Sequence, residues 1–182
     1  WEGMVARLAV LERRIEEGAD RSPETLDRAV DLSRQFLELA GKDEAPSFED
    51  LSDRWDWQID EWMACLPSHL VHAGMPEEAI ALAREWANTL DTRALYFHLV
   101  DALSRTGRGA HLDRVLTEDV ARLNLRTSDS LDVADAWLRL GEREKALEWA
   151  REAALRAGNA EDREEAWDLE SEVLKELGRT DE

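Results

Sequence analysis

Cysteine, proline and glycine are scarce in this chain of 182 residues, which contains one cysteine, four prolines and nine glycines. A single cysteine excludes an intrachain disulfide framework and is typical of a reducing compartment, so we expect a cytoplasmic protein. Few prolines and glycines mean few turns and long elements. This argues against an all-β fold, in which turn signals recur every ~8–12 residues.

Basic residues are also in short supply. The chain has 23 lysines and arginines against 42 aspartates and glutamates, which gives a net charge of −19. Such a chain repels nucleic acids and anionic membrane surfaces, and no basic stripe with interleaved aromatics offsets this repulsion. If the acidity serves recognition at all, rather than solubility alone, it favours a neutral or basic protein or peptide partner.

Long apolar runs are missing as well. None approaches the ~20 residues needed to span a bilayer, and no signal-like segment stands at the start. Because the sequence opens with Trp1 rather than methionine, we expect it to be an excerpt from a longer protein.

Helical periodicity is what the sequence has in abundance. Apolar residues recur every three to four positions along almost the whole chain, and glycines separate the periodic segments. No stretch alternates apolar and polar residues as a half-buried strand would. We therefore expect an all-α fold of about nine helices in a single domain, residues 1–182. The longer expected helices include 48–73, 109–123, 128–140, 143–157 and 160–177.

The spacing of three glycines indicates a repeat. Gly74, Gly107 and Gly141 lie 33 and 34 residues apart, each between two expected helices, and fixed spacing in this range is typical of stacked helical pairs. The segments VDALSRTG and ADAWLRLG, which end at Gly107 and Gly141, share Asp-Ala, arginine and glycine.

The segment 130–158, SLDVADAWLRLGEREKALEWAREAALRAG, resembles a tetratricopeptide repeat. Ala134, Ala146 and Ala153 stand at its small packing positions, Trp137 at its bulky aromatic position and Gly141 at its turn. The resemblance implies an α-α solenoid of antiparallel helical hairpins. Its expected parts are an atypical N-terminal hairpin (1–41), three repeat-like hairpins (48–158) and a C-terminal capping helix with a polar outer face (160–178).

The same resemblance implies a concave groove that binds a protein or peptide. By alignment to the family, the expected groove residues lie on the first helices of the pairs: His72, Phe97, His98, Asp101, Arg105, Leu131, Asp135, Leu138 and Arg139. The apolar members would grip apolar side chains of a partner, unless neighbouring helices cover them. The pairs Asp101/Arg105 and Asp135/Arg139 have i,i+4 spacing, which suits a polar ladder for a peptide or intrahelical ion pairs.

One segment concentrates reactive side chains. Cys65, His69 and His72 have i, i+4 and i+7 spacing, which puts them near one side of a helix. Zinc binds cysteine and histidine, but a tetrahedral site needs a fourth ligand that no motif supplies. By position beside the apolar seam, Cys65 and His69 are expected to be passive, and Trp62 is expected in the core. We expect no metal, cofactor or catalytic residue, since glycine-rich phosphate loops and GxSxG motifs are also missing.

The sequence thus predicts a non-catalytic protein-protein interaction module. Two alternatives stay open: a regulatory or sensor segment of a larger multidomain protein, and a helical domain that binds a small molecule or metal. Stacking of solenoid ends between chains would add self-association.

Overall fold

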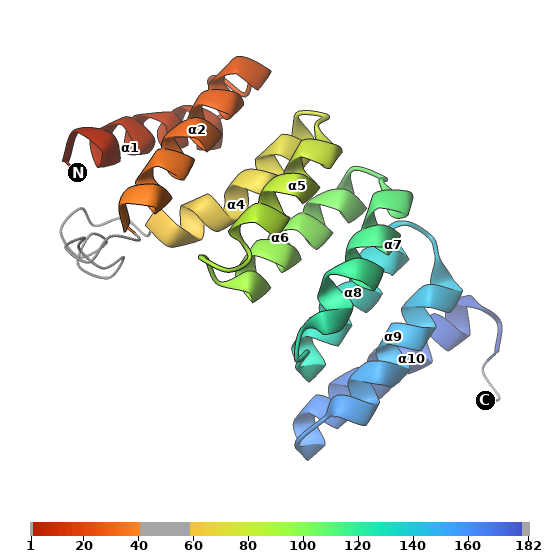
Figure 1. The fold of residues 1–182 in the computed structure, drawn as a ribbon. Coiled ribbons are helices and arrows are strands. Elements are labelled where there is room, and N and C mark those ends of the chain that lie inside the picture. The colour runs from red at the N-terminus through yellow and green to blue at the C-terminus, as the bar shows by residue number, and fades with distance from the viewer. Residues whose placement is uncertain (1, 41–58, 180–182) are drawn as a thin grey trace. The chain divides into compact units, whose positions relative to one another are not determined.

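The computed structural model describes residues 2–40 and 59–179. Every regular element in these two ranges is helical, which confirms the all-α prediction (Figure 1). The elements are α1 (Glu2–Glu16), α2 (Pro23–Ala40), α4 (Ile59–His72), α5 (Pro76–Trp86), α6 (Thr92–Arg105), α7 (Gly109–Glu118), the short 3-10 helix η1 (Val120–Arg122), α8 (Thr127–Arg139), α9 (Arg143–Arg156) and α10 (Ala160–Glu176). No helix among the described residues combines the length and apolar character needed to cross a bilayer.

The chain divides into two compact units, Trp1–Leu99 (unit 1) and Val100–Glu182 (unit 2), with the boundary inside α6. The arrangement of the hairpins as a solenoid stays a prediction. The expected loop at 42–47 and the first part of the expected helix 48–73 lie outside the described residues.

Unit 1 is built from the hairpin of α1 and α2 and from α4, which packs against α2 and α5. The apolar stripe of α1 is buried, Leu8 and Ile15 included, and Phe36 of α2 is fully buried. Trp62 is buried in α4, as its position on the apolar stripe predicted. The helix continues through Pro67, although proline cannot donate a backbone hydrogen bond. Burial of most of α4 against its neighbours offsets that loss.

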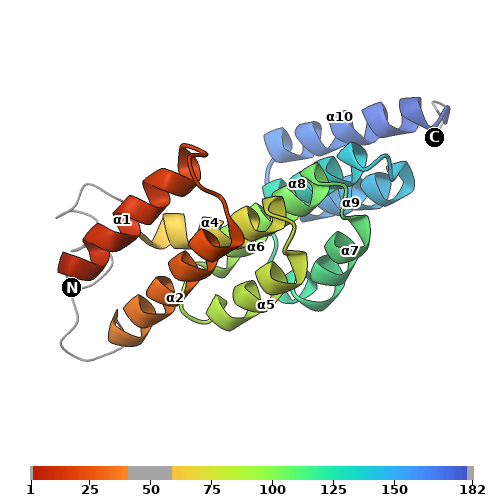
Figure 2. The ribbon, with the colours of Figure 1, turned by 90° about the horizontal axis from the view of Figure 1, so that it is seen from above.

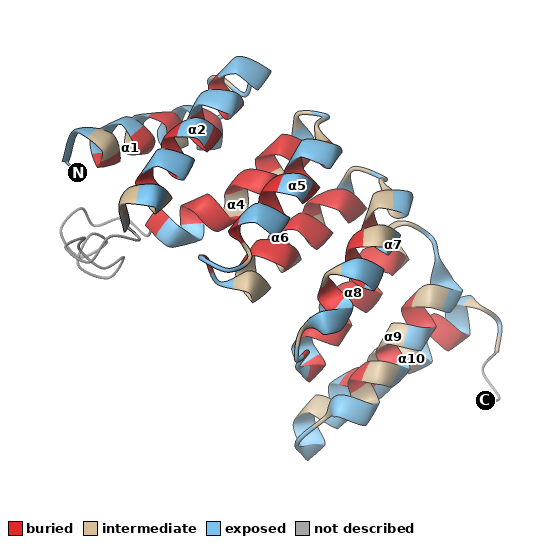
Figure 3. Ribbon diagram, in the orientation of Figure 1, coloured by how far each residue is buried: buried red, intermediate tan, exposed pale blue. Residues whose placement is uncertain are grey.

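Unit 2 contains the most regular packing. Helix α9 packs along both α8 and α10, and Figure 2 shows α9 and α10 side by side. Fully buried alanines, Ala134 on α8 and Ala146, Ala150 and Ala153 on α9, let the helix backbones approach closely. Figure 3 shows buried stretches on α8 and α9, whereas most residues of α10 are exposed or half-buried and form its outer face. That outer face is not wholly polar as expected, because Trp167 is 56% exposed.

The repeated glycines form one type of turn. At Gly141 the backbone N–H donates to the carbonyl of Leu138 at 2.9 Å, and the N–H of Glu142 donates to the carbonyl of Trp137 at 3.0 Å. This Schellman pattern needs a positive φ, which is 76° at Gly141 and which glycine adopts without strain. Gly107 has the same pattern with φ 72°. The spacing seen in the sequence is therefore a repeated helix end.

One expected helix is shorter than predicted. The segment 109–123 divides into α7, which ends at Glu118, and η1, because Asp119 leaves ideal helical geometry at φ −113° and ψ −58°. The chain then becomes extended at Leu123 before α8 begins. After this break, Ala121 of η1 borders a groove together with residues of α9.

Candidate functional site

The nine residues predicted to line a groove are distributed over both units. His72, Phe97 and His98 belong to unit 1, where His72 is exposed and the other two are half-buried. The remaining six belong to unit 2: Asp101, Arg105, Leu131, Asp135, Leu138 and Arg139. The structure brings three of these six, Asp101, Arg105 and Arg139, into one cluster.

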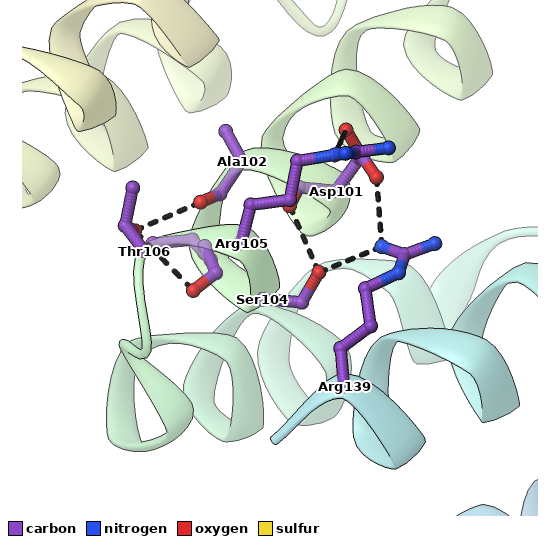
Figure 4. A network of polar contacts seen from close by, with 7 residues as sticks. Asp101, Ala102, Ser104, Arg105, Thr106 and Arg139 are labelled. Carbon is purple, nitrogen blue, oxygen red and sulfur yellow. Dashed lines mark hydrogen bonds and ion pairs between the residues drawn. The ribbon is translucent and has the colours of Figure 1, made fainter.

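The cluster centres on the carboxylate of Asp101 in α6 (Figure 4). Its Oδ2 accepts a hydrogen bond from Nε of Arg105 at 2.7 Å, and its Oδ1 accepts one from Nη1 of Arg139 in α8 at 2.7 Å. The same Nη1 donates to the hydroxyl of buried Ser104 at 2.9 Å, and that hydroxyl donates to the carbonyl of Asp101 at 2.8 Å. The two charge-assisted bonds donated by Arg139 join α8 to α6 within unit 2.

The predicted ion pairs are half correct. Asp101 and Arg105 form the i,i+4 pair that their spacing predicted. The second pair is wrong: Arg139 turns to Asp101, 38 positions earlier in the chain, rather than to Asp135. Periodicity within one helix gave no sign of this, because the better acceptor lies on another helix.

Leu131 is not a groove residue, and its prediction as an exposed apolar contact is wrong. Its exposed fraction is 8%, and it forms a core cluster with Ala153 of α9 and Ala166 of α10. Its neighbours come from α9, the second helix of its pair, as the alternative prediction of cover by neighbouring helices allowed, and also from the capping helix α10, which was not predicted to cover it. Leu138 is half-buried. Leu131 is therefore too buried to contact a partner, unlike the half-buried Leu138.

Carboxylates follow one another along one side of α8. Asp129 is buried and accepts a hydrogen bond from the backbone N–H of Arg126 at 2.6 Å, which caps the start of the helix. Asp132 and Asp135 follow at three-residue spacing, and both are exposed. We call these two residues the α8 carboxylate face. Desolvation, then Asp129 and Asp135, raise the pKa of Asp132 above its usual value. Negative charge is thus crowded here.

The segment with the cysteine and histidines has a structural role that its sequence did not show. His69 is buried, and its Nε2 lies 2.9 Å from Oε1 of Glu16 at the end of α1. The pair joins α4 to the N-terminal hairpin, so the prediction of His69 as passive is wrong. Burial, then Glu16 and Glu61, raise the pKa of the Cys65 thiol to about 11, which leaves it protonated and a weak nucleophile at neutral pH.

His69 makes stability depend on pH. Burial lowers its pKa, against the opposing effect of Glu16, while Arg21 and His72 lower it further. The unfolded state therefore binds the proton first as pH falls below ~6.5, and stability present above that pH is lost on acidification. The free energy of unfolding, measured in urea, should fall between about pH 7.5 and about pH 5.5. This fall should be smaller in His69→Gln than in wild type. Because His72 contributes to the lowered pKa of His69, His72→Gln should reduce this pH-dependent difference in unfolding free energy, but by less than His69→Gln does. A His69→Gln variant that keeps the full wild-type difference would contradict this assignment.

A groove on the other helices of unit 2 escaped the sequence prediction. It consists of two adjoining hollows, with volumes of about 360 and 240 Å³, that share Ala121, Glu148 and Trp149. We call it the α7–α9 groove; its other lining residues are Asp113, Leu116, Thr117, Leu125, Trp137, Lys145, Glu152 and Arg156. None is among the predicted groove residues, which were placed on first helices by family resemblance. The signal was the spacing of Lys145, Glu148, Trp149 and Glu152 along one face of α9.

Within residues 2–40 and 59–179, no three or more histidines, cysteines, aspartates or glutamates are grouped so as to hold a metal ion. No protein-family model, curated protein or solved structure matches this chain. The tetratricopeptide resemblance therefore stays a prediction.

Proposed function

We propose that this chain is a non-catalytic interaction module that binds a protein or peptide with basic side chains. The observation that carries the proposal is the α8 carboxylate face. Because Arg139 is engaged by Asp101, Asp135 lacks the cation that its spacing would have supplied. Asp132 and Asp135 are thus exposed neighbours of like charge in a chain of net charge −19.

A basic partner would relieve this crowding. Desolvation and, after it, the charges of Asp129 and Asp135 raise the pKa of Asp132 against the opposing effect of Arg139, so its ionised form is disfavoured. A lysine or arginine placed over the face would pair with both exposed carboxylates through charge-assisted hydrogen bonds. The Asp101 cluster supports this surface, because the two bonds donated by Arg139 of α8, to Asp101 and to Ser104, hold α8 against α6. A reducing, cytoplasmic location fits the single cysteine.

Selection from a random peptide display library would test the proposal. Peptides recovered on the wild-type protein should be enriched in lysine and arginine. Loss of two charged contacts should weaken the best of them by about tenfold or more on Asp132→Asn/Asp135→Asn. Asp168→Asn, which removes an exposed carboxylate from α10, is the matched control and should bind like wild type.

Two results would contradict the proposal. One is recovery of peptides with no excess of basic residues. The other is recovery of basic peptides whose affinity is equal for wild type, Asp168→Asn and Asp132→Asn/Asp135→Asn, since the α8 carboxylate face would then not be their binding site.

A further inference from the structure

The α7–α9 groove already contains one bound cation, supplied by the protein. Nζ of Lys145 lies 4.1 Å from the centroid of the Trp137 ring and 2.7 Å from Oδ1 of Asp113. The ring face and the carboxylate together hold the ammonium group, by cation–π attraction and a charge-assisted hydrogen bond. This end of the groove is therefore a filled cation site.

The middle of the groove has the same components without the cation. Trp149 is half-buried and Glu148 is exposed, and both border the two hollows. The groove is lined by three carboxylates and two cations, of which Lys145 pairs with Asp113 and Arg156 pairs with Glu152 at 2.6 Å. Glu148 is the carboxylate left over, and it stands next to an indole ring.

Apolar residues complete the surface. Exposed Ala121 of η1 lines the groove opposite α9, together with the edges of the nearly buried Leu116 of α7 and Leu125. Such walls suit the methylene stem of a long basic side chain, whose charged end then reaches a carboxylate. From Lys145 to Arg156 the groove follows α9 for about 16 Å at ~1.5 Å per residue. That length matches an extended peptide of about five residues.

We propose that the α7–α9 groove binds an extended peptide segment through one arginine or lysine, whose stem lies on Trp149 and whose charged group pairs with Glu148. The occupant follows from charge complementarity, because the groove has one carboxylate more than it has cations. This site is separate from the α8 carboxylate face, with which it shares no residue. It would give unit 2 a second contact with the same partner or with another one.

Three blocked pentapeptides test the site. Each has alanine at both ends and leucine at the second and fourth positions, with arginine, norleucine or glutamate at the centre. The tryptophan indole N–H signals of the ¹⁵N-labelled protein report binding, and the Trp149 signal is assigned by its loss in Trp149→Phe. We expect the arginine peptide to shift the Trp149 signal, and to bind about tenfold or more tightly than the norleucine peptide, because it gains the charged contact. The glutamate peptide should bind most weakly.

Variants of exposed residues separate this contact from general charge. Glu148→Gln should weaken binding of the arginine peptide by about tenfold. The variant should then bind the arginine and norleucine peptides with similar affinity. Glu165→Gln, an exposed carboxylate of α10, should leave both unchanged, and circular dichroism verifies that the variants stay folded. Asp132→Asn/Asp135→Asn should also leave groove binding unchanged, so failure here is distinguishable from failure of the proposed function.

The proposal is overturned if arginine and norleucine peptides bind equally, because the groove would then be an apolar contact without a cation site. It is also overturned if Glu148→Gln binds the arginine peptide like wild type, or if the Trp149 signal does not move at saturation.

Discussion

Replacement of Leu131 by aspartate is expected to lower the free energy of unfolding by about 3–5 kcal/mol. The side chain lies between α8, α9 and α10, against Ala153 and Ala166. Aspartate there would remove apolar burial and bring an unpaired charge into a site without a described cation partner. Urea unfolding monitored by circular dichroism measures the loss.

Leu155→Asp is the matched control, because Leu155 on α9 is 83% exposed. It should change stability by no more than about 0.5 kcal/mol. If Leu131→Asp is as stable as Leu155→Asp, Leu131 is a surface residue after all, and the packing of α10 over α8 is wrong.

Replacement of Trp137 by alanine should also lower the free energy of unfolding by about 3–5 kcal/mol. The ring is 2% exposed, and the start of α7 packs on it: a Cβ at Gly109 would lie 3.9 Å from its Cζ3. The change also removes the ring beneath Lys145. The unfolding midpoint in urea should fall accordingly.

The control for this prediction is Trp167→Ala, which removes an equal side chain from the exposed face of α10. We expect a loss of about 0.5 kcal/mol or less. Comparable losses in the two variants would show that Trp137 does not anchor α7, α8 and α9, and the groove geometry that depends on it would need revision.

The helices could be predicted from the sequence because each is specified by local pattern. The apolar period located α8 and α9 to within a residue or two, and Gly107 and Gly141 marked helix ends through a backbone conformation that other residues avoid. The end of α7 was missed because the break at Asp119 carries neither glycine nor proline.

The site could be predicted only in part, because its bonds join distant residues. Arg139 had an acceptor four positions away in Asp135, and only the packing of α8 on α6 supplies a better one in Asp101. His69 likewise pairs with Glu16, 53 positions earlier. Leu131 was placed in a groove by family resemblance, whereas the position of α10 decides that it is covered. Tertiary contacts of this kind leave no periodic signal.

Amide chemical shift mapping of the labelled protein with a basic peptide from the display selection tests the central claim most directly. The account predicts that the largest shifts fall on α8 around Asp132 and Asp135 and on the adjoining part of α6 around Asp101. They should vanish in Asp132→Asn/Asp135→Asn and persist in Asp168→Asn. Shifts elsewhere in the chain with none on α8, or shifts on α8 that persist unchanged in Asp132→Asn/Asp135→Asn, would contradict it.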